Sequence, residues 1–151
     1  MLFLGPGEHI SPHESVHRKN NDGKPGLLWG KSTVEVKRFI EFPGLHYTSD
    51  YTGPPDHISV ELEFMQQATL REGQAWEEGD ETAAKACLKY DKQFHEEHLM
   101  CWIPDFCDKV MAASKSPLYR EMASLTKTFI EFESRESRLR VEYLLNITVN
   151  V

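Results

Sequence analysis

Apolar side chains recur at helical spacing over most of the chain, and this period restricts the fold more than any other feature of the sequence. After the proline pair at 54–55, two apolar stripes predict a helix that is buried on two sides and fades around Gly73. A second long helix is expected from about Glu81 to Trp102, where Pro104 breaks or kinks it before a shorter helix begins. The sequence therefore predicts an all-α fold.

The last predicted helix starts at Ser116-Pro117, because serine caps helices and proline suits the first helical position. Its apolar residues lie four and three residues apart in turn, which predicts a stripe that faces the core. From Val141 to Val151 alternate residues are apolar, as in a strand. Because a lone strand has no partner in a helical domain, a disordered tail, a frayed helix and an arm that pairs with another chain all stay open. The core-facing stripe consists of Leu118, Met122, Leu125, Phe129 and Phe132.

Glycines and prolines interrupt the first quarter of the chain, which should consist of loops and short helical turns. The sequence Ser32-Thr33-Val34-Glu35 is typical of a capping box, and the helix that it opens should end near Phe42. Two prolines stiffen the linker that follows. We expect one domain over residues 1–140, made of an N-terminal part at 1–47, a hinge at 48–55 and C-terminal helices at 56–140, with a tail at 141–151.

Composition narrows the range of partners. The chain has 151 residues, 40% of them hydrophobic, and a formal net charge of −7 with no block of Lys or Arg. This balance argues against nucleic acid or an anionic membrane as the main partner. The apolar start is too short for a signal peptide and no later segment suits a bilayer, so we expect no stable membrane insertion. Three cysteines without a C-x-x-C pair fit free thiols in a reducing cytoplasm.

A cluster of metal-binding side-chain types lies inside the second long helix. Asp91, His95, His98 and Cys101 are spaced so that one helix could present them on one side, and such groups can hold zinc. The segment FHEEH is not the H-E-x-x-H motif of zinc proteases, and one helix rarely supplies a whole site. The simpler interpretation is a charged helix face with histidines packed against their neighbours. A small metal-dependent helical enzyme that uses His95, His98 and Cys101 is the alternative.

The hinge leads directly into residues that bear on function. Asp56 precedes the predicted helix, where an acid favours the helix dipole and accepts free amides. That explanation does not cover His57. Glu61 lies four residues after His57, so the two could pair on one helix face. A stiff hinge beside a polar helix start suits the binding of a partner.

The segment GPPDHISVELEFM resembles the hallmark of the TorD/DmsD family of redox-enzyme maturation chaperones, which reads roughly Glu-Pro-x-Asp-His-(Ile/Leu)-x-x-Glu-Leu-x-Phe-Met. Gly53 stands where the family often has glutamate. The segment LFLGPGEHISPHESVH is similar to the family's Leu-Phe-x-Gly-Pro … Pro-x-Glu-Ser-Val-Tyr segment, with His17 in place of tyrosine. The resemblance covers roughly residues 2–133, in motifs that keep the family's order.

The resemblance implies an all-helical, single-domain chaperone bundle that lacks the family's usual first helices and has neither catalysis nor a cofactor of its own. The implied partners are the twin-arginine leader and the apo-form of a molybdopterin-containing oxidoreductase, held in the cytoplasm until its cofactor is loaded. An acidic chain suits a leader with two arginines, and the leader's apolar stretch needs an apolar groove. Without the first helices, uncovered apolar faces would favour a homodimer or a pair that exchanges halves at the 48–55 linker.

Residues that match the family's two polar signatures form the expected leader-binding site. We expect the hinge segment and the N-terminal segment to approach each other and frame this site. Turn and cap chemistry explains two of these residues, Pro12 and Ser15, equally well. The hinge signature supplies Asp56 and His57 with Glu61 in support, and the N-terminal signature supplies Pro12, Glu14 and Ser15.

Overall fold

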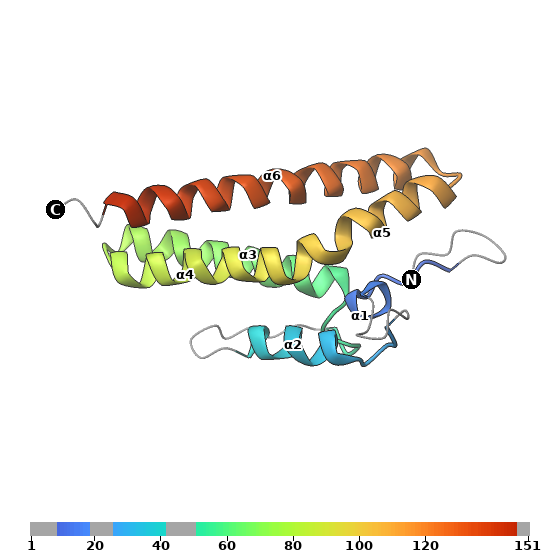
Figure 1. The fold of residues 1–151 in the computed structure, drawn as a ribbon, viewed down its shortest axis with the longest axis horizontal. Coiled ribbons are helices and arrows are strands. Elements are labelled where there is room, and N and C mark those ends of the chain that lie inside the picture. Colours follow the sequence, from blue (N-terminus) through green and yellow to red (C-terminus); the bar gives the residue numbers. More distant parts are fainter. Residues whose placement is uncertain (1–8, 19–25, 42–50, 148–151) are drawn as a thin grey trace.

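The computed structural model describes residues 9–18, 26–41 and 51–147. In this part of the chain every regular element is helical, and the all-α prediction is confirmed (Figure 1). The four-residue turn α1 and the helix α2 precede four longer helical segments. The elements are α1 (Glu14–His17), α2 (Lys31–Ile40), α3 (Ile58–Glu77), α4 (Glu81–Phe94), a π turn (His95–Leu99), α5 (Met100–Ala113) and α6 (Pro117–Ile147).

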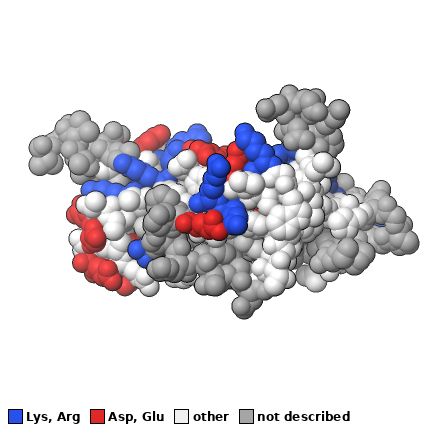
Figure 2. All heavy atoms as spheres, turned by 90° about the horizontal axis from the view of Figure 1, so that it is seen from below, with Lys and Arg blue, Asp and Glu red and all other residues white. Residues whose placement is uncertain are grey.

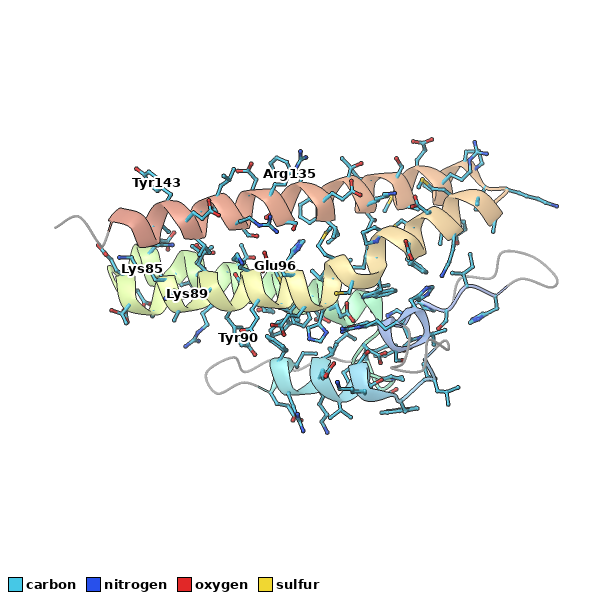
Figure 3. All side chains as sticks on the ribbon, viewed as in Figure 1. Lys85, Lys89, Tyr90, Glu96, Arg135 and Tyr143 are labelled. Atoms are coloured by element: carbon cyan, nitrogen blue, oxygen red, sulfur yellow. The ribbon has the colours of Figure 1, made fainter. Side chains whose placement is uncertain are left out.

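The long helices form a bundle with α1 and α2 on one side of it. Figure 1 shows α6 lying along the whole α4–α5 rod, with α3 packed beside α4. Tyr90 points from α4 toward α2 (Figure 3), and its hydroxyl donates a 2.6 Å hydrogen bond to the carbonyl of Phe39. The core therefore lies between α3, α4, α5 and α6, and α2 closes one side. Its largest fully buried apolar side chains are Trp102, Phe64, Phe94, Leu99, Ile103 and Ile130.

The helix α3 continues past Gly73 to Glu77, so the predicted fading at Gly73 is wrong. A glycine inside a helix costs only about 1 kcal/mol, and the buried positions Glu72 and Ala75 continue the packed face on both sides of it. The chain turns at Gly79, whose φ of 75° lies in the left-handed region that favours glycine. Asp80 then starts α4 by accepting a 2.9 Å hydrogen bond from the backbone N–H of Ala83.

Pro104 does not break the helix, because α5 runs through it to Ala113. The five residues before α5 form a π turn, which is wider than an α-helical turn. π turns and prolines both bend helices, and Figure 1 shows the α4–α5 rod changing direction in this region. The predicted kink is therefore present, and the separate shorter helix is the continuation of the same rod.

The predicted start of α6 at Pro117 is confirmed. The prediction that its apolar stripe faces the core is wrong. The exposed fractions of Leu118 and Phe129 are 67% and 53%, and the rest of the stripe is also exposed. Helical spacing tells which residues share a face, whereas the neighbouring helices decide which face is covered. Of the three alternatives for the segment from Val141, the structure favours the helix as far as Ile147, where α6 ends, so the alternating apolar residues do not form a strand there. The face that α6 buries carries Ala123, Ile130, Ser134, Ser137 and Val141.

The helix α2 begins two residues earlier than the capping box required. Gly30 is its N-cap, and no side chain caps it. Ser32 is buried inside the first turn, and Glu35 pairs with Lys31 at 3.4 Å. The predicted capping box is therefore wrong, because a serine caps a helix only from the residue before its first turn. The helix ends at Ile40, close to the predicted end near Phe42.

Candidate functional site

The N-terminal segment and the start of α3 meet in one junction, as the sequence predicted. The backbone N–H of Ile58 donates to the carbonyl of Pro12 at 2.9 Å. The backbone N–H of Glu14 donates to the carbonyl of Asp56, also at 2.9 Å. These two bonds join segments more than forty residues apart, so the two family signatures share one place in the fold.

Asp56 caps α1 and not the helix that follows it in sequence. Its Oδ2 accepts a 2.9 Å hydrogen bond from the backbone N–H of Ser15, in the first turn of α1. The residue is fully buried, and its other carboxylate oxygen has no hydrogen-bond partner among the described residues. The N-cap of α3 is His57, whose Nδ1 accepts a 3.1 Å bond from the N–H of Ser59. The interpretation of Asp56 as a local cap of its own helix is therefore wrong.

Glu14 is a fully buried carboxylate that holds two basic side chains. Its Oε1 accepts a 2.7 Å hydrogen bond from Nη1 of Arg18, four residues later. Its Oε2 accepts a 2.9 Å bond from Nδ1 of His98, which reaches it from the π turn. A buried carboxylate needs such partners, because an unpaired charge in the interior is costly. Glu14 therefore fastens α1 to the α4–α5 rod.

Glu61 is also fully buried, on the face of α3 that meets α5. Its Oε2 accepts a 3.0 Å hydrogen bond from the indole Nε1 of Trp102. Burial, and after it the charge of Glu14, raises the pKa of Glu61 well above its usual range. The predicted pairing of Glu61 with His57 is absent from the hydrogen bonds of the described residues, because Glu61 faces the core and His57 faces outward.

Aromatic rings, and not carboxylates, form the accessible surface of the junction. The ring centroid of His57 lies 4.8 Å from that of Tyr51 and 5.0 Å from that of His13. Burial lowers the pKa of both histidines, which favours their neutral forms. A Cβ added at Gly53 would meet the outer end of the Tyr51 ring, so the ring would have to move to admit a larger residue.

An open cavity of about 430 Å³ borders the outer side of the junction. It combines two arginines with two glutamates, so its charges largely balance. Figure 2 shows the side of the molecule on which α2 lies, where positive and negative side chains alternate and neither forms a continuous patch. The cavity is lined by Arg18, Glu35, Arg38, Phe39, Glu97, His98 and Cys101.

The predicted metal cluster is not assembled. His98 binds Glu14, whereas the Sγ of Cys101 contacts the carbonyl of Glu97 at 3.3 Å and His95 lies in a groove on another side of the rod. Among the described residues, no three His, Cys, Asp or Glu side chains converge on a possible metal site. The π turn is the reason, because its wider turn changes the directions expected for a regular helix.

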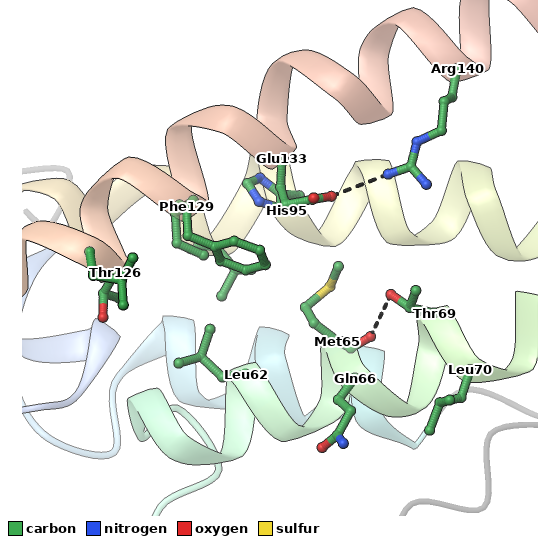
Figure 4. Close-up of a pocket in the computed structure, with 13 residues that line it drawn as sticks. Leu62, Met65, Gln66, Thr69, Leu70, His95, Thr126, Phe129, Glu133 and Arg140 are labelled. Carbon is green, nitrogen blue, oxygen red and sulfur yellow. Dashed lines mark hydrogen bonds and ion pairs between the residues drawn. The ribbon is translucent and has the colours of Figure 1, made fainter. Parts of the chain in front are cut away.

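A second concave region, missed by the sequence reasoning, lies between α3 and α6. This α3–α6 groove has a volume of about 690 Å³ and mainly apolar walls (Figure 4). Two members of the misread stripe, Leu125 and Phe129, belong to it. The stripe itself could have indicated the groove, because a helix face exposed to water rarely carries so many large apolar side chains. Its lining also includes Leu62, Met65, Gln66, Thr69, Leu70, His95, Thr126, Glu133 and Arg140.

Similar proteins support the resemblance that the motifs carry. "Chaperone protein TorD" of Photobacterium profundum is 28% identical over 134 residues, which cover 88% of this chain and 59% of that protein. "Chlorate reductase assembly chaperone protein" of Ideonella dechloratans is 29% identical over 134 residues, 85% of this chain and 65% of that protein. The chain thus spans about three fifths of the length of these curated relatives. No solved structure matches it.

Two further findings complete the comparison. None of the described helices is long and apolar enough to cross a membrane. A family model described as "Nitrate reductase delta subunit" matches residues 1–108, which include both signatures and the whole junction. Because this match covers more than half of the chain, the protein belongs to the nitrate reductase delta subunit family, and the resemblance to TorD-type chaperones is confirmed.

Proposed function

We propose that this chain is a cytoplasmic assembly chaperone for a molybdopterin-containing oxidoreductase. It binds the twin-arginine leader of the apoenzyme and holds the enzyme until its cofactor is loaded, without catalysis of its own. The observation that carries this proposal is the junction, in which the two family signatures are joined by backbone hydrogen bonds. Relatives named as TorD and as a chlorate reductase assembly chaperone support the same role.

Burial divides the six expected site residues into two groups. Glu14, Ser15, Asp56 and Glu61 are buried and have partners inside the protein, so they hold α1 against α3 and α5. The other two, Pro12 and His57, are partly exposed. We propose that these two contact the leader and that the buried four set their positions.

Two further features support the choice of partner. The net charge of −7 favours the approach of a leader that carries two arginines. The exposed side chains of α6, such as Leu118 and Met122, support association with a second copy, so a homodimer is part of the proposal. Light scattering over a range of concentrations tests the dimer, and a mass that stays at one chain would contradict it.

Peptide binding tests the proposed function directly. A synthetic leader peptide with two adjacent arginines should bind more tightly at low salt than at high salt, since exposed charges are screened. The same peptide with both arginines replaced by glutamine should bind more weakly. His57→Gln should weaken binding, and a melting curve should accompany it because the change also removes the side-chain cap of α3. Failure of the parent protein to bind the arginine peptide would refute the proposed leader recognition.

A further inference from the structure

The exposed apolar stripe of α6 repeats every seven residues. Its members lie four and three residues apart in turn from Leu118 to Phe132, and after Glu136 the same period continues with Leu139 and Tyr143. A seven-residue apolar repeat is the pattern of a coiled-coil seam, which packs against another helix. Figure 3 shows Tyr143 projecting from α6 away from the α4–α5 rod. The stripe is therefore a second packing face of α6, distinct from the face that the rod buries.

The area of the stripe suits a stable interface. The exposed fractions of its seven apolar side chains lie between 48% and 69%. Together these side chains expose on the order of 700 Å², close to the roughly 800 Å² that each partner buries in a stable complex. The α3–α6 groove, which Leu125 and Phe129 also line, offers a partner helix further contacts with α3. A second helix laid along the stripe would thus be held on two sides.

Two charged residues beside the stripe form no ion pair among the described residues. Glu121 and Arg135 are both exposed, whereas the next two arginines of α6 both pair with glutamates. Each of the two stands one residue before a position of the seven-residue repeat, so both flank the stripe on the same side. They are fourteen residues apart, about 21 Å along a helix, and cannot reach each other within one copy.

From this pattern we propose that the α6 helices of two copies pair antiparallel along the stripe. Leu125 then packs against the partner's Phe129, and Glu121 pairs with the partner's Arg135. Two-fold symmetry makes each of these contacts twice. The occupant of the stripe is a second copy because the pattern is complementary to itself when reversed. The inference rests on the homodimer in the proposed function and assigns the interface and the direction of that dimer.

Other arrangements of the two helices bring like charges together. A parallel pair would place Glu136 against the same residue of the partner, and Arg135 beside the partner's Arg140. An antiparallel pair shifted by one repeat would place Glu121 beside the partner's Glu142. The arrangement proposed here avoids all three contacts.

Charge reversal tests the pairing of Glu121 with Arg135. Glu121→Arg and Arg135→Glu should each weaken the dimer about fivefold in sedimentation equilibrium, because each turns two attractive pairs into repulsive ones. The variant that carries both changes should return to within about twofold of the parent, because opposite charges meet again. Glu131→Arg is the matched control, since Glu131 is exposed on α6 but does not flank the stripe.

Cross-linking tests the direction of the pair. Cys87→Ser and Cys101→Ser first remove the two accessible thiols, since Cys107 is buried. With the short linker bismaleimidoethane, Thr128→Cys should join two copies, because position 128 lies beside the two-fold axis. Leu118→Cys should not, because its two copies lie about 27 Å apart along the antiparallel helices. Linking through Leu118→Cys and not through Thr128→Cys would show a parallel pair and overturn the proposal.

A polar substitution tests the stripe itself. Phe129→Ser should weaken the dimer about tenfold, because apolar area is lost from the centre of the interface. Leu28→Ser is the control, since Leu28 is 45% exposed and lies outside α6. Melting curves accompany every variant. If Phe129→Ser does not fold, Leu125→Ser replaces it, since Leu125 is 64% exposed.

The outcomes separate this interface from the proposed function. A single-chain mass at every concentration would refute both the α6 pairing and the homodimer, while binding of the arginine peptide by that single chain would leave leader recognition in place. A dimer that Phe129→Ser does not weaken would show that the copies meet elsewhere, so the α6 pairing would fail and the homodimer would stand. A double charge reversal as weak as the single ones would refute the contact of Glu121 with Arg135.

Discussion

The carboxylate of Asp56 accepts a 2.9 Å hydrogen bond from the backbone N–H of Ser15, forty-one residues earlier in the chain. Asp56, which stands just before α3, thus accepts a hydrogen bond from a backbone N–H in the first turn of α1. The bond is fully buried, and backbone bonds between the same segments lie next to it. The N-terminal segment is in this way fixed to α3 by polar contacts as well as by packing.

Replacing Asp56 should cost more stability than replacing an exposed helix cap. Asp56→Ala should lower the free energy of unfolding by about 2–3 kcal/mol, because a buried N–H loses its acceptor. Asp56→Asn keeps an oxygen at the same place and should retain most of the stability. Asp80→Ala is the matched control, because Asp80 caps α4 at the same distance but from an exposed position. Urea denaturation measures all three, and equal losses for the two alanine variants would contradict the fastening role.

Glu61 should make stability depend on pH in a defined direction. The pKa of its carboxyl group is raised by burial and by Glu14, so the folded protein keeps a proton that the unfolded chain releases near pH 4.5. Stability is therefore lost as the pH rises from that value toward the raised pKa, by about 1.4 kcal/mol for each unit of difference. Glu61→Gln should remove this loss, whereas Glu77→Gln, at an exposed site on the same helix, should not. Parallel stability curves for the parent and Glu61→Gln would contradict the assignment.

Asp91 should add a second loss of stability as the pH rises. Burial, and after it the charge of Glu72, raises the pKa of Asp91 to about 7, while Arg140 opposes this shift. The folded protein therefore keeps a proton that the unfolded chain releases near pH 3.8, and stability is lost as the pH rises from that value toward about 7. Glu133 and His95 lie in the same region, and burial lowers the pKa of His95, which keeps it neutral. Urea denaturation at several pH values tests this, and Asp91→Asn should flatten the profile. A slope that persists in Asp91→Asn would assign the proton to another group.

His95 should lower the stability of the fold, because both of its ring nitrogens are buried without a partner among the described residues. His95→Phe removes two unsatisfied nitrogens beside an open groove, so it should raise the free energy of unfolding by about 1–3 kcal/mol. His98→Phe is the control, since His98 is paired with Glu14 and its replacement should destabilise the fold. Calorimetric melts compare the two variants, and a loss of stability in both would mean that His95 has a partner in solution.

The sequence predicts the helices that are specified by neighbouring residues along the chain. The start of α6 follows from Ser116-Pro117, and the long helices follow from their apolar period. The meeting of the N-terminal segment with the hinge followed from the resemblance, because both signatures belong to one family pattern. The structure supplies the bonds that join them, from Pro12 to Ile58 and from Asp56 to Glu14.

The rest depends on partners that are distant in sequence. From the sequence, Asp56 is predicted to cap the helix that follows it. Its hydrogen bond with the backbone N–H of Ser15 crosses forty-one residues, and no local pattern indicates it. The stripe of α6 predicts one apolar face correctly but not its direction, which α4 and α5 determine by covering Ile130. His95 and His98 were grouped by a regular helical period that the π turn interrupts. Packing partners and one irregular turn account for these differences.

The π turn acts on the helix as the insertion of one residue would. Each residue of an α-helix advances the direction of the next side chain by about 100°, so an extra residue rotates everything that follows it. His95, at the start of the turn, faces the groove, while His98 and Trp102 face the junction. Deleting one residue here would leave a continuous helix but turn the Trp102 indole away from Glu61. The number of residues in this stretch is therefore as important as their identity for keeping both surfaces in place.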